Sequence, residues 1–420
     1  MELVQQSIIK SNDSNYKELE HLCHLAKNLY NAGLYAIKQQ YEKDKTYLKY
    51  VDLDRKFKLE NNVDYRTLQA AQSQQVLRML DKTYSSFFAS IKSEKASKAR
   101  PPKYLKKDGK YTLVCTSVGL SQKKLYQNII CPGKTKLNIR FSNIEPNKIQ
   151  QVRFIPKTNY IVMEIVYKVD EKQLKDNNSK YLSIDLGLKN LATCTTNIEK
   201  PFIINGRQLC SMNQFYNKEK AKISSELEKK NKKKSSKKLQ NLTLKRNNKV
   251  KDYLHNASRR IIGYAVDRQI NTIIIGKNDC WKQDINLGKK NNQNFVQIPH
   301  SQFVSMLQYK AKLEGINVIL TEESYTSKCS FLDKEEICKH ETYAGKRTTT
   351  KLFQTKTGLK LNADVNGSLN IMRKGLEKIN ASDDVLYNSE PVSRGLVVNP
   401  VKIDISQNES VSKVIHNEYF

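Results

Sequence analysis

The chain has 420 residues, with 73 Lys and Arg against 42 Asp and Glu, and a formal net charge of +31. This length allows two or three domains and a sizeable core. So large a positive charge fits an enzyme of small molecules poorly and is typical of a protein that binds a polyanion, above all nucleic acid.

Membrane and secretory features are missing from the sequence. No apolar run approaches the ~20 residues that a membrane span needs, and the first residues lack the pattern of a signal peptide. The eight cysteines are scattered and form no disulfide framework. We therefore expect a cytoplasmic, nucleoid-associated protein without a membrane partner.

The first hundred residues predict a helical lobe over residues 13–97. Capping residues at 12–15 precede apolar residues at helical spacing up to Ile37, and a second long helix is predicted over about residues 65–93. The paired prolines of a basic loop at residues 100–110 end these helices.

Short strands follow the basic loop. A period of two predicts strands at residues 111–115, 137–141, 149–155 and 160–169. We expect residues 1–12 and 98–175 to form a small β-barrel. The lysines of the preceding loop are candidate phosphate contacts: Lys103, Lys106, Lys107 and Lys110. The alternative is a solvated loop.

From residue 181 the pattern becomes mixed. Two strands, a long charged helical segment, a strand at 272–275, a helix at 301–314, a strand at 318–321 and a helix after Asp364 predict an α/β layer over residues 180–375. The overall class is therefore multidomain α+β. Residues 376–420 form a C-terminal tail to which the sequence assigns no role.

A strongly basic helical insertion is predicted over residues 212–270. Residues 217–251 contain 14 Lys or Arg against three Glu. A solvated coiled coil is the alternative, but the one-sided charge favours a helical hairpin that faces nucleic acid. Its candidate contacts are Lys229, Lys230, Lys232, Lys233, Lys234, Lys237, Lys238, Arg246 and Lys249.

Two aspartates stand in settings that suit a metal site. Asp185 ends an apolar run that reads as a buried strand, and Asp364 lies at the start of a helix. Carboxylates at such positions hold hard divalent cations. The alternatives are a turn residue for Asp185 and a helix N-cap for Asp364.

Seven motifs together resemble the TnpB (OrfB) insertion-sequence family, which is related to type V CRISPR effector nucleases. They are LCHLAKNLYN (22–31), RPPKY (100–104), IDLGLKNLA (184–192), RNNKVKDYLH (246–255), LQYKA (307–311), YTSKC (325–329) and NADVN (362–366). The resemblance implies a helical recognition lobe, a barrel-like wedge and a RuvC-like nuclease domain of RNase H fold. It also implies DNA cleavage directed by a guide RNA from the element's transcript, and it allows a transposase partner.

The resemblance makes Asp185 and Asp364 the first and last catalytic acids of a site for two magnesium ions. The middle acid departs from the family pattern, because glycine and lysine, Gly276 and Lys277, stand where a strand normally ends in glutamate. Asp279 follows too late. We expect a relocated ligand at Glu322 or Glu323, with Glu323 preferred; the alternative is that the third acid is lost.

The family's zinc ribbon is also altered. Residues 324–361 contain Cys329, Cys338 and His340 but no CxxC pair, whereas tetrahedral zinc requires four ligands. We expect a degenerate ribbon without its ion, with Cys329 and Cys338 as ligands if zinc binds.

The sequence thus predicts a magnesium-dependent, RNA-guided DNA endonuclease encoded by a transposable element. Two alternatives remain: a guide-directed DNA-binding regulator with an impaired nuclease site, and an RNA-binding accessory protein of transposition. The guide sequence, the target-flanking motif and the oligomeric state do not follow from the sequence.

Overall fold

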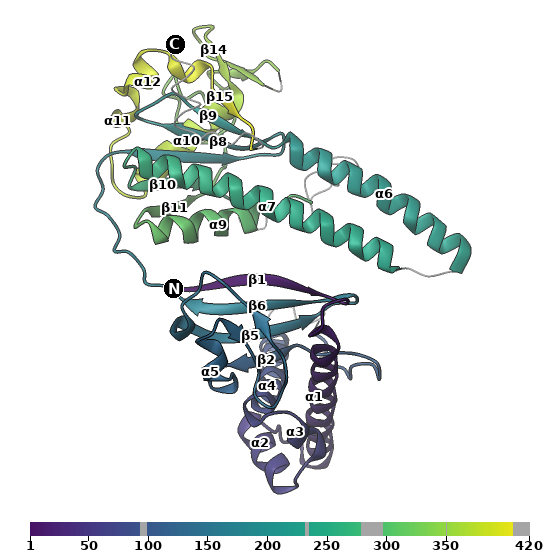
Figure 1. Ribbon diagram of the computed structural model, residues 1–420. Helices are drawn as coiled ribbons and strands as arrows, with labels where there is room; N and C mark the ends of the chain where they lie inside the picture. Colours follow the sequence, from purple (N-terminus) through teal and green to yellow (C-terminus); the bar gives the residue numbers. More distant parts are fainter. Residues whose placement is uncertain (93–98, 232–234, 279–296, 350, 406–420) are drawn as a thin grey trace. The chain divides into compact units, whose positions relative to one another are not determined.

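The computed structural model describes residues 1–92, 99–231, 235–278, 297–349 and 351–405 (Figure 1). The chain divides into two compact units, residues 1–170 and residues 171–420. Both contain helices and strands, so the mixed α+β class is confirmed. Within the described ranges, no helix is both long and apolar enough to cross a membrane.

The first unit is built on an antiparallel sheet with the strand order β1-β6-β5-β2. Its strands are β1 (Glu2–Lys10), β2 (Leu113–Thr116), β5 (Ile149–Pro156) and β6 (Tyr160–Lys168). A separate two-stranded sheet contains β3 (Ile129–Ile130) and β4 (Ile139–Arg140). Strands β1 and β2 are edges that do not pair with each other among the described residues, so this sheet is open and the predicted small β-barrel is not confirmed. Alternation of apolar residues reveals strands but does not reveal whether the outer two meet.

Helices cover this sheet and share one hydrophobic cluster with it. They are α1 (Tyr16–Asp44), α2 (Tyr50–Leu59), α3 (Val63–Thr67), α4 (Ala70–Lys92) and α5 (Gln122–Leu125), with short 3₁₀ turns at η2 (Ser117–Gly119) and η3 (Pro146–Lys148). The helix predicted over residues 65–93 is broken between α3 and α4, because Leu68 is extended. The separation of this unit into a helical lobe and a wedge stays a prediction.

The second unit contains a mixed sheet of order β11-β10-β7-β8-β9-β15. The strands are β7 (Tyr181–Leu186), β8 (Asn190–Thr196), β9 (Phe202–Asn205), β10 (Thr272–Gly276), β11 (Asn317–Thr321) and β15 (Val401–Ile403). Strands β7, β8 and β9 are antiparallel neighbours. Strands β10 and β11 run parallel to β7, and β15 runs parallel to β9.

Helices cover both faces of this sheet. Helix α10 (Ala363–Glu377) packs on one face, where Tyr181 and Ile274 lie, whereas α7 (Lys237–Asp267) and α9 (His300–Leu313) pack on the other, where Leu182 and Ile273 lie. The remaining elements are α6 (Arg207–Asn231), α11 (Asp384–Tyr387), α12 (Glu390–Ser393), η4 (Leu396–Val398), and a small sheet of β12 (Lys346–Arg347), β13 (Leu352–Gln354) and β14 (Lys360–Asn362).

Helices α6 and α7 form an antiparallel hairpin that projects from the sheet (Figure 1). The Ser236 side chain caps α7 by accepting a hydrogen bond from the Leu239 N–H at 3.2 Å. Tyr216 of α6 and Thr243 of α7 are hydrogen-bonded at 3.1 Å, which joins the two helices. The C-terminal half of α7 is buried on the sheet, so the hairpin is anchored at one end.

Candidate active site

Asp185 lies near the end of β7, on the face of the sheet that α10 covers. It pairs with Thr193 of β8, and Ser183, two residues before it, is hydrogen-bonded to Ser368 of α10 at 2.9 Å. A Cβ atom built on Gly367 would lie 3.1 Å from Asp185 Oδ2. A residue without a side chain at position 367 therefore lets α10 approach the carboxylate closely.

The two adjacent glutamates after β11 point to different surroundings. Glu322 is largely exposed, and its carboxylate lies 3.9 Å from Lys374 Nζ. Glu323 lies over Gly276, because a Cβ built on Gly276 would be 2.6 Å from Glu323 Oε1. Successive residues of an extended chain face different ways, so Glu323 lies over Gly276 whereas Glu322 lies at the exposed Lys374 side of α10.

Hydrogen bonds fix the backbone on both sides of the Glu323 side chain. The Glu323 N–H donates to Asn278 Oδ1 at 2.9 Å, and the Glu323 carbonyl accepts from Thr326 Oγ1 at 2.8 Å. Lys374 of α10 donates to the next carbonyl, that of Ser324, at 2.9 Å. The segment that carries the carboxylate is thus held to β10 and to α10.

The electrostatics of the site are those of crowded carboxylates. Burial, and then the neighbouring Glu323 and Asp364, raise the pKa of Asp185 well above its ordinary range, while Arg347 acts in the opposite direction. Burial raises the pKa of Glu323 to about 7. Glu323 Oε1 is buried and has no hydrogen-bond partner within the described part of the chain. Such an atom carries a desolvation cost that a bound cation would remove.

Asp364 occupies the first turn of α10, but it is not the N-cap. Asn362 is the N-cap and accepts hydrogen bonds from the N–H groups of Asp364 and Val365, so the alternative of Asp364 as a capping residue is wrong. The Asp364 carboxylate has two partners of its own. Asn190 donates to Oδ2 at 2.7 Å, and Arg347 Nη2 lies 2.8 Å from Oδ1.

The donor chemistry of this group fits a hard divalent cation. Carboxylate oxygens are the ligands that magnesium prefers. The Glu323 carboxylate has an unpartnered oxygen and is near enough to Asp185 to raise its pKa. Asp364, however, is engaged by Arg347. No three His, Cys, Asp or Glu side chains of the described residues lie close enough together to hold one ion. Glu323 and Asp364 both act electrostatically on Asp185, and Asp364 is in addition paired with Arg347.

A pocket of about 550 Å³ opens beside Asp185 and Asp364. Five cationic side chains line it: Lys189, Arg207, Arg347, Lys351 and Lys402. Of these, Arg347 and Lys402 had no local sequence signal, because each lies in a strand of only two or three residues. Two acids surrounded by cations suit a phosphodiester, whose negative charge needs neutralisation.

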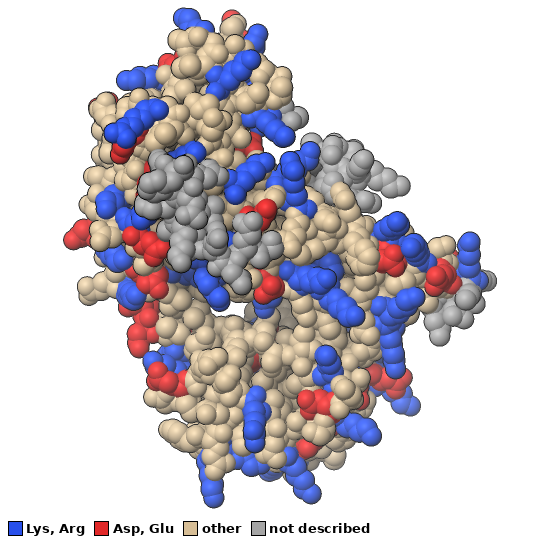
Figure 2. Space-filling view, turned by 45° about the horizontal axis from the view of Figure 1, so that its top comes forward, with Lys and Arg blue, Asp and Glu red and all other residues tan. Residues whose placement is uncertain are grey.

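The predicted phosphate contacts outside this pocket are mostly exposed. In the first unit Lys103, Lys106 and Lys107 are exposed, whereas Lys110 is ion-paired with Glu20. On the hairpin Lys229, Lys237, Lys238 and Lys249 are exposed. Lys232, Lys233 and Lys234, the side chain of Lys230, and Asp279 lie outside the described residues. Figure 2 shows Lys and Arg side chains spread over the visible face, including the projecting hairpin.

Arg246 differs from the other basic residues of the hairpin. Its guanidinium donates to Asn213 Oδ1 at 2.6 and 2.8 Å and to the Gln297 carbonyl at 2.7 Å. It is partly buried and joins α7 to α6 and to the segment before α9. A structural role is therefore visible for Arg246, and a phosphate contact is not.

Two carboxylates accept backbone hydrogen bonds within the segment that resembles a zinc ribbon. Glu335 accepts hydrogen bonds from the N–H groups of Ser330 at 2.7 Å and Ala344 at 2.8 Å. Asp333 accepts from the Lys356 N–H at 2.9 Å. Cys338 Sγ lies 3.4 Å from His340 Nε2, and Cys329 Sγ bonds the Cys338 carbonyl.

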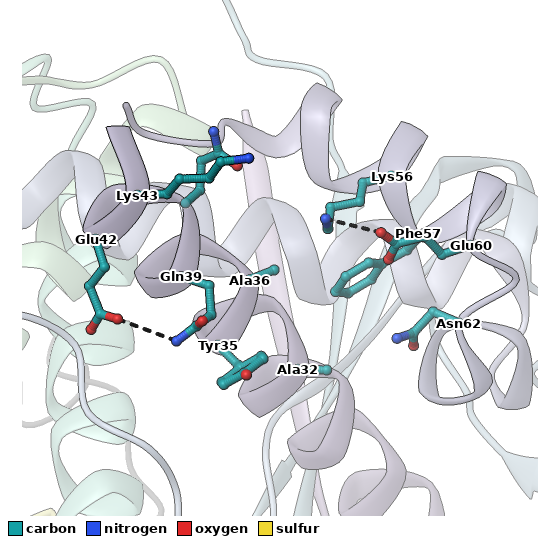
Figure 3. A pocket seen from close by; sticks show the side chains of 11 residues that line it. Ala32, Tyr35, Ala36, Gln39, Glu42, Lys43, Lys56, Phe57, Glu60 and Asn62 are labelled. Carbon is teal, nitrogen blue, oxygen red and sulfur yellow. Dashed lines mark hydrogen bonds and ion pairs between the residues drawn. The ribbon is translucent and has the colours of Figure 1, made fainter. Parts of the chain in front are cut away.

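A second pocket lies in the first unit, between α1 and α2 (Figure 3). Its acids already have partners: Glu60 is ion-paired with Lys56 at 3.0 Å, and Glu42 accepts a hydrogen bond from Gln39 at 3.3 Å. It contains none of the residues singled out from the sequence. We assign it no catalytic role.

Comparisons with known proteins give two family matches. Residues 164–281 match the family OrfB_IS605, described as a probable transposase, and residues 300–371 match the Cas12f1-like TNB domain. No curated protein matches the sequence.

Three solved structures are among those to which the chain is similar. A Cas12f1–sgRNA–target DNA complex is 15% identical, with 88% of this chain and 98% of that chain covered and a TM-score of 0.35. A CRISPR-Cas12f ternary complex is 14% identical, with coverages of 84% and 81% and a TM-score of 0.35. The mini-RNA-guided endonuclease CRISPR-Cas_phi3 is 12% identical, with coverages of 90% and 92% and a TM-score of 0.45.

The two family matches fall on the segments that carry the sequence motifs around Asp185, the basic helices and Asp364. They confirm the resemblance found in the sequence. Over residues 164–281 and 300–371 the chain is therefore similar to the OrfB_IS605 family, described as a probable transposase, and to the Cas12f1-like TNB domain.

Proposed function

We propose that this protein is a metal-dependent endonuclease that cleaves DNA under the direction of a guide RNA. The observation that carries the proposal is the position of Glu323. Its buried and unpartnered Oε1 lies over Gly276, and its charge raises the pKa of Asp185. A buried acid without a partner is costly unless it serves a ligand.

Asp185 and Glu323 would hold magnesium, and Asp364 is the third carboxylate of the site. Bound magnesium would supply an activated water and neutralise charge on the phosphodiester. Asn190 orients the Asp364 carboxylate. The cations that line the pocket would bind the backbone of the DNA strand and orient it towards the acids.

The excess of positive charge, which is spread along the chain, supports a nucleic-acid partner. The exposed lysines of the α6–α7 hairpin suit a guide RNA or an RNA–DNA duplex, because a protein reads such a duplex through its backbone charge. The guide would come from the element's own transcript. A transposase partner and a nucleoid location stay predictions.

A second function has one specific observation in its favour. Arg347 neutralises Asp364, and no described trio of acids is assembled for a metal ion. This arrangement suits a guide-directed DNA-binding protein with an impaired nuclease site. An accessory RNA-binding protein is less well supported, because it gives no reason for a buried, unpartnered Glu323 beside Asp185.

Cleavage by the complex purified with RNA transcribed next to the gene tests these functions. We expect magnesium-dependent cleavage of matching DNA by the wild type, and its loss in Asp185→Ala and Glu323→Gln. Glu322→Gln is the matched control, because Glu322 is exposed and faces Lys374. Full activity of Glu323→Gln would refute the role of this residue. DNA binding without cleavage by the wild type would favour the regulator.

A further inference from the structure

One row of residues crosses four neighbouring strands of the sheet in the second unit. Asp185 pairs with Thr193, Thr193 pairs with Ile203, and Ile203 pairs with Lys402. Residues that pair across strands share a face of the sheet. Lys402 therefore lies on the same face as Asp185, three strands away, which is about 14 Å at the usual spacing of strands.

Strand β15, which carries Lys402, is firmly attached to the sheet (Figure 1). Its neighbours Val401 and Ile403 are almost fully buried in the core of the other face. The Val401 N–H donates to the Pro201 carbonyl at 2.9 Å, and Asn205 donates to Asp404 at 2.6 Å. The alternation of the strand thus leaves the exposed Lys402 side chain on the pocket face.

Lys402 lines the same pocket as Asp185, Thr193 and Asp364. Arg207 also lines it, at the start of α6, where the Gly206 N–H donates to the Lys189 carbonyl at 2.8 Å. In the part of the chain that the structure describes, neither Lys402 nor Arg207 forms an ion pair with an acid. Their charges are available to a ligand.

We propose that Lys402, delivered by the C-terminal strand, binds a backbone phosphate of the nucleic-acid strand that lies across the pocket next to Asp185. The ligand is a phosphodiester chain, since the pocket joins the cations of Lys402 and Arg207 to the carboxylates of Asp185 and Asp364. This inference rests on the proposed function and gives the tail, through β15, a part in substrate binding. Arg207 is placed to contact the same strand.

Two measurements on the full chain test the inference. The first is binding of a labelled single-stranded oligothymidine in EDTA, where no cleavage occurs, at a series of salt concentrations. One lost phosphate contact lowers affinity about fivefold at about 0.1 M salt, because one contact contributes about 0.7 to the salt exponent. We expect this loss, and a slope smaller by about 0.7, for Lys402→Gln. Lys175→Gln is the control, because Lys175 is exposed and precedes the opposite end of β7.

The second measurement is magnesium-dependent cleavage of target strands by the RNA-bound complex. Each target strand carries one neutral methylphosphonate, and its position differs from strand to strand. We expect one position near the cleavage site to slow the wild type about fivefold and to have no further effect in Lys402→Gln. Lys402→Arg should restore both measurements. Thermal unfolding should be unchanged in all three variants, since the side chain is exposed.

The outcomes separate the inference from the proposed function. If Lys402→Gln behaves like the wild type and like Lys175→Gln in both measurements, the inference is overturned, whatever the cleavage activity. Absence of cleavage by the wild type would overturn the proposed function, and the oligothymidine measurement would still decide whether Lys402 binds phosphate.

Discussion

Substitution of Gly276 by alanine tests whether cleavage depends on where Glu323 lies. The backbone of Gly276 has no positive φ, so alanine fits its conformation. The new Cβ, however, would lie 2.6 Å from Glu323 Oε1 and 2.6 Å from Ile371 Cδ1. To restore ordinary contact distances, both the carboxylate and the isoleucine have to move by about 1 Å relative to this Cβ.

A displacement of this size is large for a catalytic group. About 1 Å of misplacement costs on the order of 100-fold in rate, and overpacking of a core costs about 1–3 kcal/mol of stability. We therefore expect Gly276→Ala to lower the single-turnover rate of DNA cleavage roughly 100-fold in saturating magnesium. The rate is measured well below the unfolding temperature of the variant, which is determined separately.

Gly263→Ala is the matched control. A Cβ on Gly263 meets nothing within 4 Å, and the residue lies within helix α7. Alanine there should stabilise the protein by about 1 kcal/mol and leave cleavage unchanged. Wild-type cleavage by folded Gly276→Ala would refute the reasoning, because it would show that the Glu323 carboxylate can be displaced without consequence.

Three further predictions concern stability. Burial raises the pKa of Glu323 from 4.5 to about 7, so in the metal-free protein the folded state keeps a proton that the unfolded chain loses. The free energy of unfolding should then fall by up to roughly 3 kcal/mol as pH rises from about 4.5 to 7, and urea titrations should show that Glu323→Gln removes this part of the fall. Gly375→Ala, whose Cβ would collide with Ile274, should cost about 1–3 kcal/mol in the same assay. A chelator selective for zinc over magnesium should leave the unfolding temperature unchanged, because carboxylates hold the ribbon of Cys329 and Cys338; about one zinc per chain by metal analysis would contradict this.

The sequence predicted the features that depend on local periodicity. The strand before Asp185, the strand before Glu322, the helix after Asp364 and the two basic helices all lie close to their expected positions. The two strands and the helix after Asp364 have apolar patterns that identify them without knowledge of their neighbours, whereas the basic helices were predicted from their one-sided charge.

Features that depend on pairing between distant segments were not predictable in this way. The open edge of the first sheet depends on whether β1 meets β2, and the ion pair of Arg347 with Asp364 depends on a two-residue strand. The three residues of β15 are too few to show the alternation that predicts a strand within a polar tail. The sequence therefore could not place Lys402 on the pocket face.

The position of the third acid follows from the order of three parallel strands. Ile275 pairs with Ile184, so Gly276 comes next beside Asp185, and Gly276 in turn pairs with Thr321. Residues two apart on an extended chain share a face, so Glu323 continues the face of Thr321 past the end of β11. A glutamate at position 276 would need the volume that the Glu323 side chain occupies.

The site can therefore take its third carboxylate from β10 or from the end of β11, but not from both. We expect Glu323→Gly to abolish cleavage and the double substitution Gly276→Glu with Glu323→Gly to restore part of it, since the acid then reaches the same space from β10. The assay is single-turnover cleavage in magnesium, with Gly276→Gln and Glu323→Gly combined as the uncharged control of equal volume. If the folded double variant with glutamate is no more active than this control, the space over Gly276 is not where the third carboxylate acts.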